Sequence, residues 1–387
     1  MRRGAAVAIV GGGAIGASIA FHLAARGERD VVVLDRGTVP GEGSTGRATG
    51  GFRVQFATAV DVRLSLLARE KLRRFAEETG GECGFVPAGY LWVAERPEEL
   101  AALRDELAVQ RANGVTDAVE LDADGVAACN PALRRGGVIG GTYCPSDGFI
   151  RPLRILEGYR RAAASRGVRF VWDAEVVGFE RAGDGRITAV RTAREELAAG
   201  CVVNAAGAWA RAVARLAGFD LPVAPLRRQV AVTVPTDALP APMPMTIYPG
   251  DGFHLRVRDG RVLLLLPTAG AADAFDVSVE PAWIAAVTRE AHARVPCLAN
   301  VAIDRAACWG GLYEMSPDGH AIVGVAPGVP NLVLANGASG HGVMHAPALG
   351  QLVAEIVLDG AATSLDVAAL APERFARAGA HAKRELL

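Results

Sequence analysis

Three glycines near the start of the chain have the spacing of a nucleotide-binding turn. Gly11, Gly13 and Gly16 follow the apolar run of residues 5–10, and they would allow a tight strand-to-helix turn whose backbone approaches a pyrophosphate. The N–H groups and the positive dipole end of the helix would hold that anion. Asp35 ends the next apolar run, where a carboxylate can accept a hydrogen bond from a ribose hydroxyl. The combination predicts a bound dinucleotide.

A glycine-rich stretch with a prominent arginine follows this motif. Residues 37–56 contain few large apolar side chains, and their many glycines suit a loop that wraps closely around a ligand. Arg53 in this stretch carries a planar guanidinium that matches the two oxygens of a carboxylate. A contact with phosphate and a solvated side chain are the alternatives for Arg53.

The first half of the chain is predicted to alternate helices and strands around these residues. Helices are expected at residues 58–79 and 97–112, with a strand at 85–93 between them. A helix over residues 151–167 is followed by strands, whereas residues 114–150 are rich in turn-forming residues and give no clear pattern. The alternation is typical of an α/β protein.

The second half predicts a discontinuous nucleotide-binding domain. Residues 201–218 repeat the order of strand, small-residue turn and helix, which indicates a second close approach of the backbone to the ligand. Between residues 222 and 316 longer strands predominate, with one helix near 281–294, so a second domain is expected there. Residues 331–360 return to strand, glycine turn and helix.

The composition excludes several classes of protein. The length of 387 residues suggests two or three domains. With a net charge of −1, the chain has no excess of positive charge that would favour binding to nucleic acid or to an anionic membrane surface. No run of about 18 apolar residues is present, so no membrane span is expected. The apolar run that follows Met1, Arg2 and Arg3 is cut by glycines and lacks a cleavage site, which makes the cytoplasm the expected location.

No metal site is expected. The six cysteines show neither a CxxC pair nor zinc spacing, and they are predicted to be reduced, structural thiols. His341 and His345 are four residues apart, but the HExxH pattern is absent and no carboxylate ligand lies nearby in the sequence.

Several motifs together resemble the FAD-dependent D-amino acid oxidase family, especially its glycine oxidase, sarcosine oxidase and amine dehydrogenase branches. They are GGGAIG with LDR, STGRATGGFR, NAAGAW, GLYEMSPDG and ANGASGHGVMHAPALG. The resemblance implies an α/β fold with a Rossmann-like FAD-binding domain of the glutathione-reductase type, interrupted by an inserted α+β substrate domain built on an antiparallel sheet. The FAD-binding domain would comprise residues 1–84, 150–221 and 317–387, and the substrate domain residues 85–149 and 222–316.

The resemblance also implies which residues bind FAD. The glycine turn and the end of the second strand would hold the ADP half, and the loop after them would lie beside the pyrophosphate and the flavin. The last helix would point its N-terminus at the flavin, whose reduced form gathers negative charge that such an end stabilises. The residues so assigned are Gly11, Gly13, Ala14, Ile15, Gly16, Asp35, Arg36, Ser44, Thr45, Arg47, Ala48, Thr49, Gly50, Val176, Ala206, Gly207, Trp209, Gly311, Gly340, His341, Gly342, Val343 and Met344.

Two features of sarcosine oxidases have no counterpart at the matching positions. Some members of that branch link the flavin to a cysteine two residues before the tyrosine that matches Tyr313. Gly311 stands there in this chain and Cys308 comes too early, so FAD is expected to be noncovalent. The branch also uses an active-site lysine to activate oxygen, and the only lysines here, Lys71 and Lys383, do not match it.

The substrate side is inferred from the same resemblance. Arg53 matches a carboxylate-binding arginine of the sarcosine oxidase branch, and Tyr313 stands where the glycine oxidase branch has an arginine. Tyr248, His254 and Arg256 could line the substrate side or be ordinary strand residues.

The implied reaction is hydride transfer from the carbon that bears an amine to flavin N5, which gives an imine that water hydrolyses. The substrate would be an amino acid or an N-substituted glycine, a secondary amine. Oxygen or an electron-acceptor protein would take up the electrons, and the second case describes a dye-linked dehydrogenase subunit. An NAD-dependent dehydrogenase and a flavin-binding protein without catalysis are further alternatives.

Overall fold

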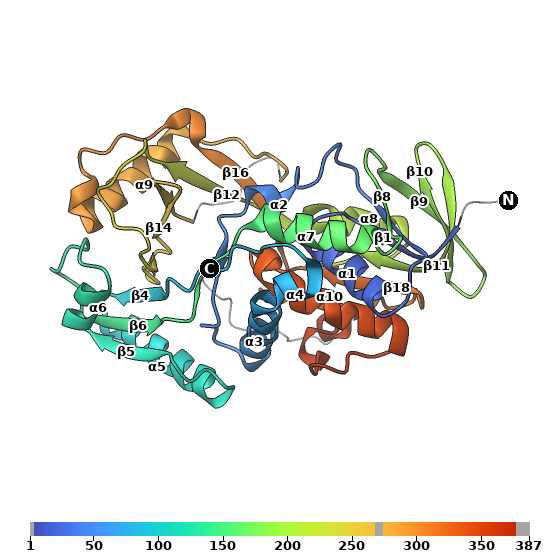
Figure 1. Cartoon of the computed structure of the whole chain (residues 1–387), viewed down its shortest axis with the longest axis horizontal. Helices are drawn as coiled ribbons and strands as arrows, with labels where there is room; N and C mark the ends of the chain where they lie inside the picture. The colour runs from blue at the N-terminus through green and yellow to red at the C-terminus, as the bar shows by residue number, and fades with distance from the viewer. Residues whose placement is uncertain (1–3, 268–273, 377–387) are drawn as a thin grey trace.

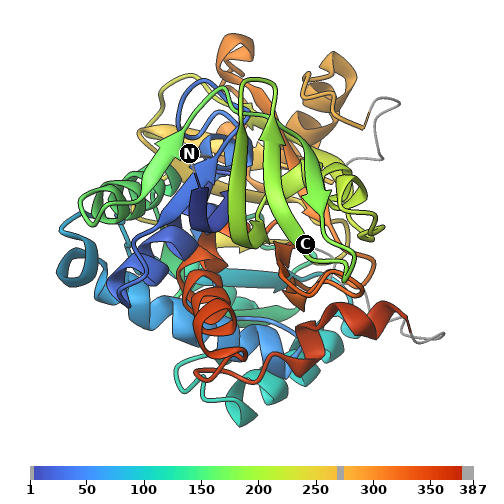
Figure 2. The same cartoon turned by 90° about the vertical axis from the view of Figure 1, so that its right-hand side faces the viewer.

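A largely parallel sheet occupies one end of the molecule, on the right in Figure 1. The computed structural model describes residues 4–267 and 274–376. Six strands run in the order β17-β18-β11-β1-β2-β8, and β10 and β9 extend β11 as an antiparallel hairpin that faces the viewer in Figure 2. The strands are β1 (Gly4–Val10), β2 (Val31–Leu34), β8 (Arg169–Val171), β9 (Val176–Arg181), β10 (Ile187–Thr192), β11 (Glu196–Asn204), β17 (Ile322–Val325) and β18 (Leu332–Asn336).

Layers on both faces of this sheet explain its continuous apolar strands. Val31 and Val33 of β2 face a core shared with helices α1 (Ala14–Ala25), α7 (Pro152–Ala164) and α10 (Gly342–Asp359). Val32 and Leu34 face the opposite core, which the β9–β10 hairpin and α8 (Ala210–Leu216) cover. A strand buried on both faces needs apolar residues at every position, as this one has.

Helices α1 and α10 make an unusually close contact across the first core. A Cβ atom placed on Gly350 of α10 would lie 2.1 Å from Ser18 Oγ and 2.7 Å from the Ser18 carbonyl carbon. Only glycine fits at this crossing because the obstacle includes backbone. The contact ties the C-terminal helix to the helix that follows the glycine turn.

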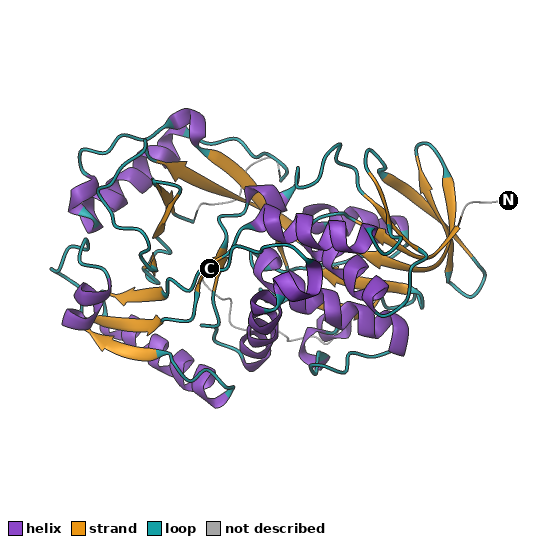
Figure 3. Cartoon of the chain, viewed as in Figure 1, coloured by secondary structure: helices purple, strands orange, loops and turns teal. Residues whose placement is uncertain are grey.

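A second sheet lies at the other end of the molecule, on the left in Figure 1. Its order is β16-β12-β15-β14-β13-β4-β6-β5, and every pair is antiparallel except β13 with β4. Helices α5, α6 and α9 cover it, as Figure 3 shows. These elements are β4 (Tyr90–Ala94), α5 (Pro97–Ala112), β5 (Val119–Asp122), α6 (Ala123–Cys129), β6 (Gly140–Cys144), β12 (Ala224–Val232), β13 (Met245–Ile247), β14 (His254–Arg258), β15 (Arg261–Leu265), α9 (Pro281–Arg294) and β16 (Trp309–Met315).

The α/β fold is confirmed, and several expected element boundaries are wrong. The strand expected at 85–93 begins at Tyr90, because Pro87 and Gly89 interrupt the extended run. The helix expected at 58–79 divides at Arg74, where the backbone leaves helical geometry. The two resulting helices are α3 (Ala59–Arg73) and α4 (Phe75–Thr79).

Two stretches contain more regular structure than their sequence suggests. Residues 114–150 contain β5 and β6 of the second sheet, the helix α6 that packs against it, and β7 (Gly148–Phe149). The loop of residues 37–56 includes the one-turn helix α2 (Ser44–Arg47) and β3 (Gly51–Phe52), which pairs with β7. The two sheets use alternating segments of the chain, and the exact domain division remains a prediction. In the described part of the chain no helix is long and apolar enough to cross a membrane.

The contact between α1 and α10 predicts the effect of adding one methyl group. We expect Gly350→Ala to lower the free energy of unfolding by about 1–3 kcal/mol, because the new Cβ overlaps the Ser18 backbone. Urea denaturation measures the change. Gly183→Ala is the matched control, since nothing lies within 4 Å of a Cβ at Gly183. Equal stability of the two variants would contradict the close contact.

Candidate active site

The carboxyl ends of four parallel strands meet at one edge of the first sheet, and a predicted motif follows each. Parallel pairing of β2 with β1, of β1 with β11 and of β11 with β18 brings these ends together. Ligands of open α/β sheets bind at this edge. The motifs are the glycine turn after β1, Asp35 after β2, Ala206 and Gly207 after β11, and the turn to Gly340 after β18.

The glycine turn after β1 leaves no room for side chains. Gly11 has a φ of +108°, and a Cβ there would lie 2.3 Å from the Ala205 carbonyl oxygen. A Cβ on Gly16 would lie 1.9 Å from the Gly11 carbonyl oxygen. Thr45 Oγ1 accepts a hydrogen bond from the Ala14 N–H at 3.1 Å. Helix α1 starts without an acidic residue in its first turn, as an anion site requires.

Asp35 and Arg36 lie where the ADP half of a dinucleotide was expected. Asp35 accepts hydrogen bonds from the Gly12 N–H at 2.6 Å and from the Gly37 N–H at 2.7 Å, which hold its carboxylate beside the turn. The Arg36 guanidinium lies 4.6 Å from the Trp209 ring centroid. Val176, assigned to the adenine end, is buried at the start of β9.

The loop that contains α2 is fastened to the second sheet. Ser44 Oγ donates to the Leu312 carbonyl at 2.8 Å, and Arg47 donates to the Gly310 carbonyl at 3.0 Å. Gly311 fits beside this loop, because a Cβ there would lie 3.1 Å from Arg47 Cβ. These hydrogen bonds hold the loop against β16.

Arg256 binds this loop instead of lining the substrate side. Its Nη1 donates to the carbonyl oxygens of Thr49 at 2.7 Å and Gly50 at 2.9 Å, and its guanidinium lies 3.6 Å from the Phe149 ring centroid. Burial lowers the pKa of Arg256 to about 9. No local pattern shows that this arginine joins the second sheet to the loop of residues 37–56.

The N-terminus of α10 lies at the same edge. Gly340 has a φ of +95°, and a Cβ there would lie 2.4 Å from Tyr313 Cε2. His341 is the N-cap residue, Gly342 and Val343 begin the helix, and its first turn carries no acidic residue. The positive end of an 18-residue helix is thus available to an anionic edge of a ligand.

A cavity between the two sheets gathers many of the predicted residues. It is lined by Thr49, Gly51, Arg53, Tyr90, Arg228, Gln229, Met245, Ile247, His254, Leu265, Leu266, Pro267, Tyr313, Gly340, His341 and Met344. The structure therefore brings Arg53, Tyr313 and His254 to one place, next to the N-terminus of α10.

Arg53 is held firmly within this cavity. Its side chain is 7% exposed and donates to the Gln55 carbonyl at 3.0 Å. Its Nη2 lies 3.0 Å from His341 Nε2, so His341 accepts there and carries its own proton on Nδ1. The guanidinium also lies 4.2 Å from the Phe56 ring centroid and 5.1 Å from that of Trp92. These contacts hold the guanidinium in place within the cavity.

His254 is a neutral histidine at neutral pH. Its Nδ1 lies 2.9 Å from the Gly252 carbonyl oxygen, so Nδ1 carries the proton and Nε2 is an acceptor. Burial, together with the positive charges of Arg228 and Arg53, lowers the pKa of His254 to about 4. Burial raises the pKa of the Tyr313 hydroxyl, which therefore stays protonated.

Tyr248 does not join this group, contrary to the expectation. It lies past the end of β13, where it packs against Phe253 in the core of the second sheet. The Arg294 guanidinium lies 4.4 Å from its ring centroid. The role assigned to Tyr248 is wrong because its ring belongs to this core.

Three ionisable residues near the site, two buried and one half-buried, were not predicted from the sequence. Arg228 lines the cavity beside Tyr313. Asp147 accepts hydrogen bonds from the Val54 N–H at 2.8 Å and from Gln55 Nε2 at 3.3 Å, and burial raises its pKa to about 7. No spacing rule marks these positions, because each depends on pairing between distant segments.

Glu314 is the third missed residue. The Gly337 and Ala338 N–H groups interact with its carboxylate, whereas burial raises its pKa to about 7. Its Oε2 has no hydrogen-bond partner among the described residues. Its Oε1 would lie 3.9 Å from a Cβ on Gly342, so the carboxyl group lies near the start of α10.

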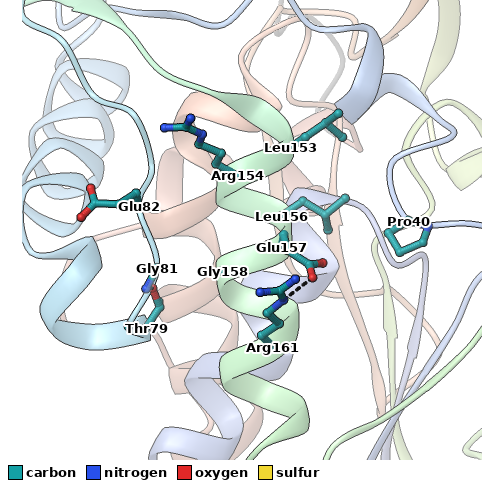
Figure 4. Close-up of a pocket in the computed structure, with 11 residues that line it drawn as sticks. Pro40, Thr79, Gly81, Glu82, Leu153, Arg154, Leu156, Glu157, Gly158 and Arg161 are labelled. Carbon is teal, nitrogen blue, oxygen red and sulfur yellow. Dashed lines mark hydrogen bonds and ion pairs between the residues drawn. The ribbon is translucent and has the colours of Figure 1, made fainter.

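Another hollow on the surface carries none of the predicted residues. It lies between α7, residues 79–82 and Pro40, as Figure 4 shows. Glu157 on its wall is already ion-paired with Arg160 and Arg161.

The described residues hold no cluster of three side chains that could bind a metal ion. His345, one of the two histidines weighed as metal ligands, contacts a serine: its Nε2 lies 2.8 Å from Ser65 Oγ.

The sequence matches a known family over most of its length. The family model described as FAD dependent oxidoreductase, DAO, matches residues 6–356. The chain belongs to the DAO family. Membership makes it an FAD-dependent oxidoreductase and confirms the resemblance stated from the motifs.

Individual members of the DAO family are similar over nearly the whole chain. FAD-dependent oxidoreductase domain-containing protein 1 of Xenopus laevis is 31% identical, over 95% of this chain and 82% of its own length. Glycine oxidase of Geobacillus kaustophilus is 30% identical, over 91% of this chain and 92% of its own. The crystal structure of L-proline dehydrogenase from P. horikoshii has a TM-score of 0.90 at 28% identity, covering 97% and 99% of the two chains.

The residues of this DAO-family chain fit FAD. The backbone cradle at Gly11 and Gly16 excludes any Cβ, as a pyrophosphate site does. The helices α1 and α10 both start without acids in their first turns. The cavity begins where α10 starts, so a flavin ring there would have the arginine and the histidine beside it.

Burial of Glu314 predicts a pH dependence of folding stability. Its pKa is about 7 in the folded protein against 4.5 ordinarily, so between these pH values the folded chain keeps a proton that the unfolded chain releases. Stability therefore falls as the pH rises through this window. We expect Glu314→Gln to remove up to about 3 kcal/mol of that fall.

Urea denaturation of the FAD-free protein at pH 5 and pH 8 measures this difference. Glu175→Gln is the control, because Glu175 is exposed, and it should keep the fall seen in the unchanged protein. An unchanged pH dependence in Glu314→Gln would contradict the raised pKa.

Proposed function

We propose that the protein oxidises the C–N bond of an amino acid or an N-substituted glycine, with noncovalently bound FAD as its cofactor. The bound FAD supplies a hydride acceptor at flavin N5, and the substrate leaves as an imine that water hydrolyses. The buried guanidinium of Arg53 in the cavity is the observation that carries this proposal.

Arg53 would bind the substrate carboxylate. Its bonds to the Gln55 carbonyl and to His341 fix the guanidinium before a substrate arrives, which reduces the ordering cost of binding. A charge-assisted, bidentate contact fits the planar fork of an arginine. The substrate carbon next to the carboxylate would then lie near the N-terminus of α10.

His254 and Tyr313 would orient the substrate. The unprotonated Nε2 of His254 can accept a hydrogen bond from the amine. Tyr313 stays protonated, and its hydroxyl can donate a hydrogen bond to a carboxylate oxygen. Apolar residues such as Met344 and Leu265 line the same cavity and would exclude water.

Noncovalent binding of FAD is supported by the surroundings of Cys308, the cysteine closest in sequence to Gly311. Cys308 Sγ lies 3.3 Å from the Asp304 carbonyl oxygen and 3.4 Å from the Val232 N–H. It does not line the cavity. Gly311, at the position of the attached cysteine in some relatives, has no side chain to form the bond.

A dehydrogenase that passes electrons to a partner is the second candidate function. The sarcosine oxidase branch uses an active-site lysine to activate oxygen, and among the described residues that line the cavity there is no lysine. Lys71 lies on α3, ion-paired with Glu78 at 3.4 Å, and Lys383 lies outside the described residues. The similarity to an L-proline dehydrogenase structure also favours this candidate.

Anaerobic mixing tests the proposed reaction. The purified protein should show an oxidised flavin spectrum that bleaches with at least one member of a panel of glycine, N-alkyl glycines, proline and D-amino acids. Admission of air then separates the two candidates, because rapid recovery of the spectrum marks an oxidase. A spectrum that no amine bleaches would contradict C–N oxidation, and flavin that remains attached after denaturation would contradict noncovalent binding.

Substitution of Arg53 tests the carboxylate contact. We expect Arg53→Leu to weaken binding of carboxylate substrates by about 1.5–3 kcal/mol, because one charge-assisted contact is lost. Titration of the flavin spectrum measures the dissociation constant. Arg63→Leu is the control, since Arg63 lies on α3 and contacts Asn113. Equal affinities in the two variants would rule out Arg53 as the ligand.

A further inference from the structure

The side chain of Tyr90 reaches from the second sheet to the loop of residues 37–56. On β4, Leu91 packs into the core that α9 covers, whereas Tyr90 and Trp92 lie on the other face with Met245 of β13. Side chains alternate in this way along a strand. Tyr90 is among the residues that line the cavity, and only 5% of it is exposed.

A glycine in the loop makes room for the end of this side chain. A Cβ atom on Gly51 would lie 1.8 Å from Tyr90 Oη, 3.1 Å from Tyr90 Cζ and 3.3 Å from Met245 Cε. Gly51 also lines the cavity. The Tyr90 hydroxyl therefore occupies the place that a side chain of residue 51 would fill.

This place lies on the same face of the loop as Arg53. Phe52 and Val54 are buried in the first core, whereas Gly51 and Arg53 line the cavity. Alternate residues of an extended chain share a face, with Cα atoms two residues apart separated by about 7 Å. The Tyr90 hydroxyl is thus presented beside Arg53, as a side chain two residues earlier in the loop would be.

Strand β4 accompanies the loop past both positions. Trp92, two residues after Tyr90, lies with its ring centroid 5.1 Å from the Arg53 guanidinium. Gln55 joins the two segments, because its Nε2 donates to the Tyr90 carbonyl at 3.1 Å and its own carbonyl accepts from Arg53 at 3.0 Å. These contacts fix Tyr90 and Arg53 relative to each other at one corner of the cavity.

The Tyr90 hydroxyl is a hydrogen-bond donor at neutral pH. Burial raises the pKa of this hydroxyl, although the charges of Arg53 and Arg256 oppose the rise, so the group stays protonated. Within the described part of the chain the hydroxyl has no hydrogen-bond partner. Because buried donors are nearly always paired, a group that enters the cavity is the acceptor to expect.

We propose that the Tyr90 hydroxyl donates a hydrogen bond to the substrate carboxylate that Arg53 binds. This inference rests on the proposed function, since it concerns the same carboxylate in the same cavity. The two oxygens of a carboxylate offer about four acceptor positions, of which a bidentate arginine uses two. A bond from Tyr90 to a third position would fix the tilt of the carboxylate, and with it the direction of the carbon that bears the amine.

Binding of an unreactive acid to the FAD-loaded protein measures this contact without turnover. Propionate and propionamide have similar shapes, and only propionate is an anion. We expect Tyr90→Phe to weaken propionate binding at least about tenfold and propionamide binding less than about threefold, because a hydrogen bond to a charged acceptor is the stronger one. Titration of the flavin spectrum measures both dissociation constants. Equal weakening of the two ligands would indicate a change of cavity shape and overturn the inference.

A second variant displaces the hydroxyl and keeps the tyrosine. Gly51→Ala places a Cβ where Tyr90 Oη lies, so it should also weaken propionate binding. The double variant Gly51→Ala, Tyr90→Phe should bind propionate within about twofold of Tyr90→Phe alone, because both changes remove one and the same contact. Losses that add in the double variant would overturn the inference.

Tyr143→Phe is the matched control. Tyr143 lies on β6, the neighbour of β4, and its hydroxyl also lies against a glycine, 2.6 Å from a Cβ on Gly89. It is not a lining residue, so propionate binding should be unchanged. The flavin spectrum of ligand-free Tyr90→Phe should match that of the unchanged protein, and a shifted spectrum would assign the hydroxyl to the flavin and overturn the inference.

The Arg53→Leu variant separates this inference from the proposed function. Weaker propionate binding in both Arg53→Leu and Tyr90→Phe supports the shared carboxylate site. Weaker binding in Arg53→Leu alone supports the Arg53 contact and overturns the role of Tyr90. Weaker binding in Tyr90→Phe alone overturns the shared site, because Arg53 would not hold the carboxylate. A flavin that no amine bleaches overturns C–N oxidation, whereas the propionate affinities still decide the role of Tyr90.

Discussion

The parallel pairing of β1, β11 and β18 is the constraint on which the site depends. These strands come from the beginning, the middle and the end of the chain, and their carboxyl ends must lie at one edge of the sheet. The glycine turn, the Ala206–Gly207 turn and the N-terminus of α10 are therefore neighbours in space. The close contact of Gly350 with Ser18 holds α10 against α1, the helix that follows the glycine turn.

The electrostatics of the cavity follow from which groups hold its arginines. Among the described contacts of Arg53 are a carbonyl oxygen, a neutral imidazole and an aromatic face. The buried acids nearby, Asp147 and Glu314, have pKa values raised to about 7 and so are partly protonated near neutral pH. The outer face of the same sheet differs, since Arg227 is neutralised there by two carboxylates.

Local patterns in the sequence were enough to predict the fold class and the parts of the site that follow strand ends. Gly11, Asp35 and His341 belong to motifs whose spacing is set by a strand, a turn and a helix. Arg228 could not be chosen over Arg227 in this way, because the choice depends on which face of β12 meets the cavity. Tyr248 and His254 both looked like strand residues, but only His254 lies on a strand that crosses the cavity floor. Residues 114–150 gave no pattern because their short strands are stabilised by partners far along the chain.

The order of strands in the first sheet also has a consequence for synthesis of the protein. Strand β1 leaves the ribosome well before β11, its parallel neighbour, and β18, which pairs with β11. Contacts between such distant segments make folding slow, because long loops must close before the contacts form. The nascent chain must therefore keep the apolar β1 and β2 from aggregating until α10 has emerged. Capture of the cofactor at the completed strand edge accordingly follows the synthesis of β18 and α10.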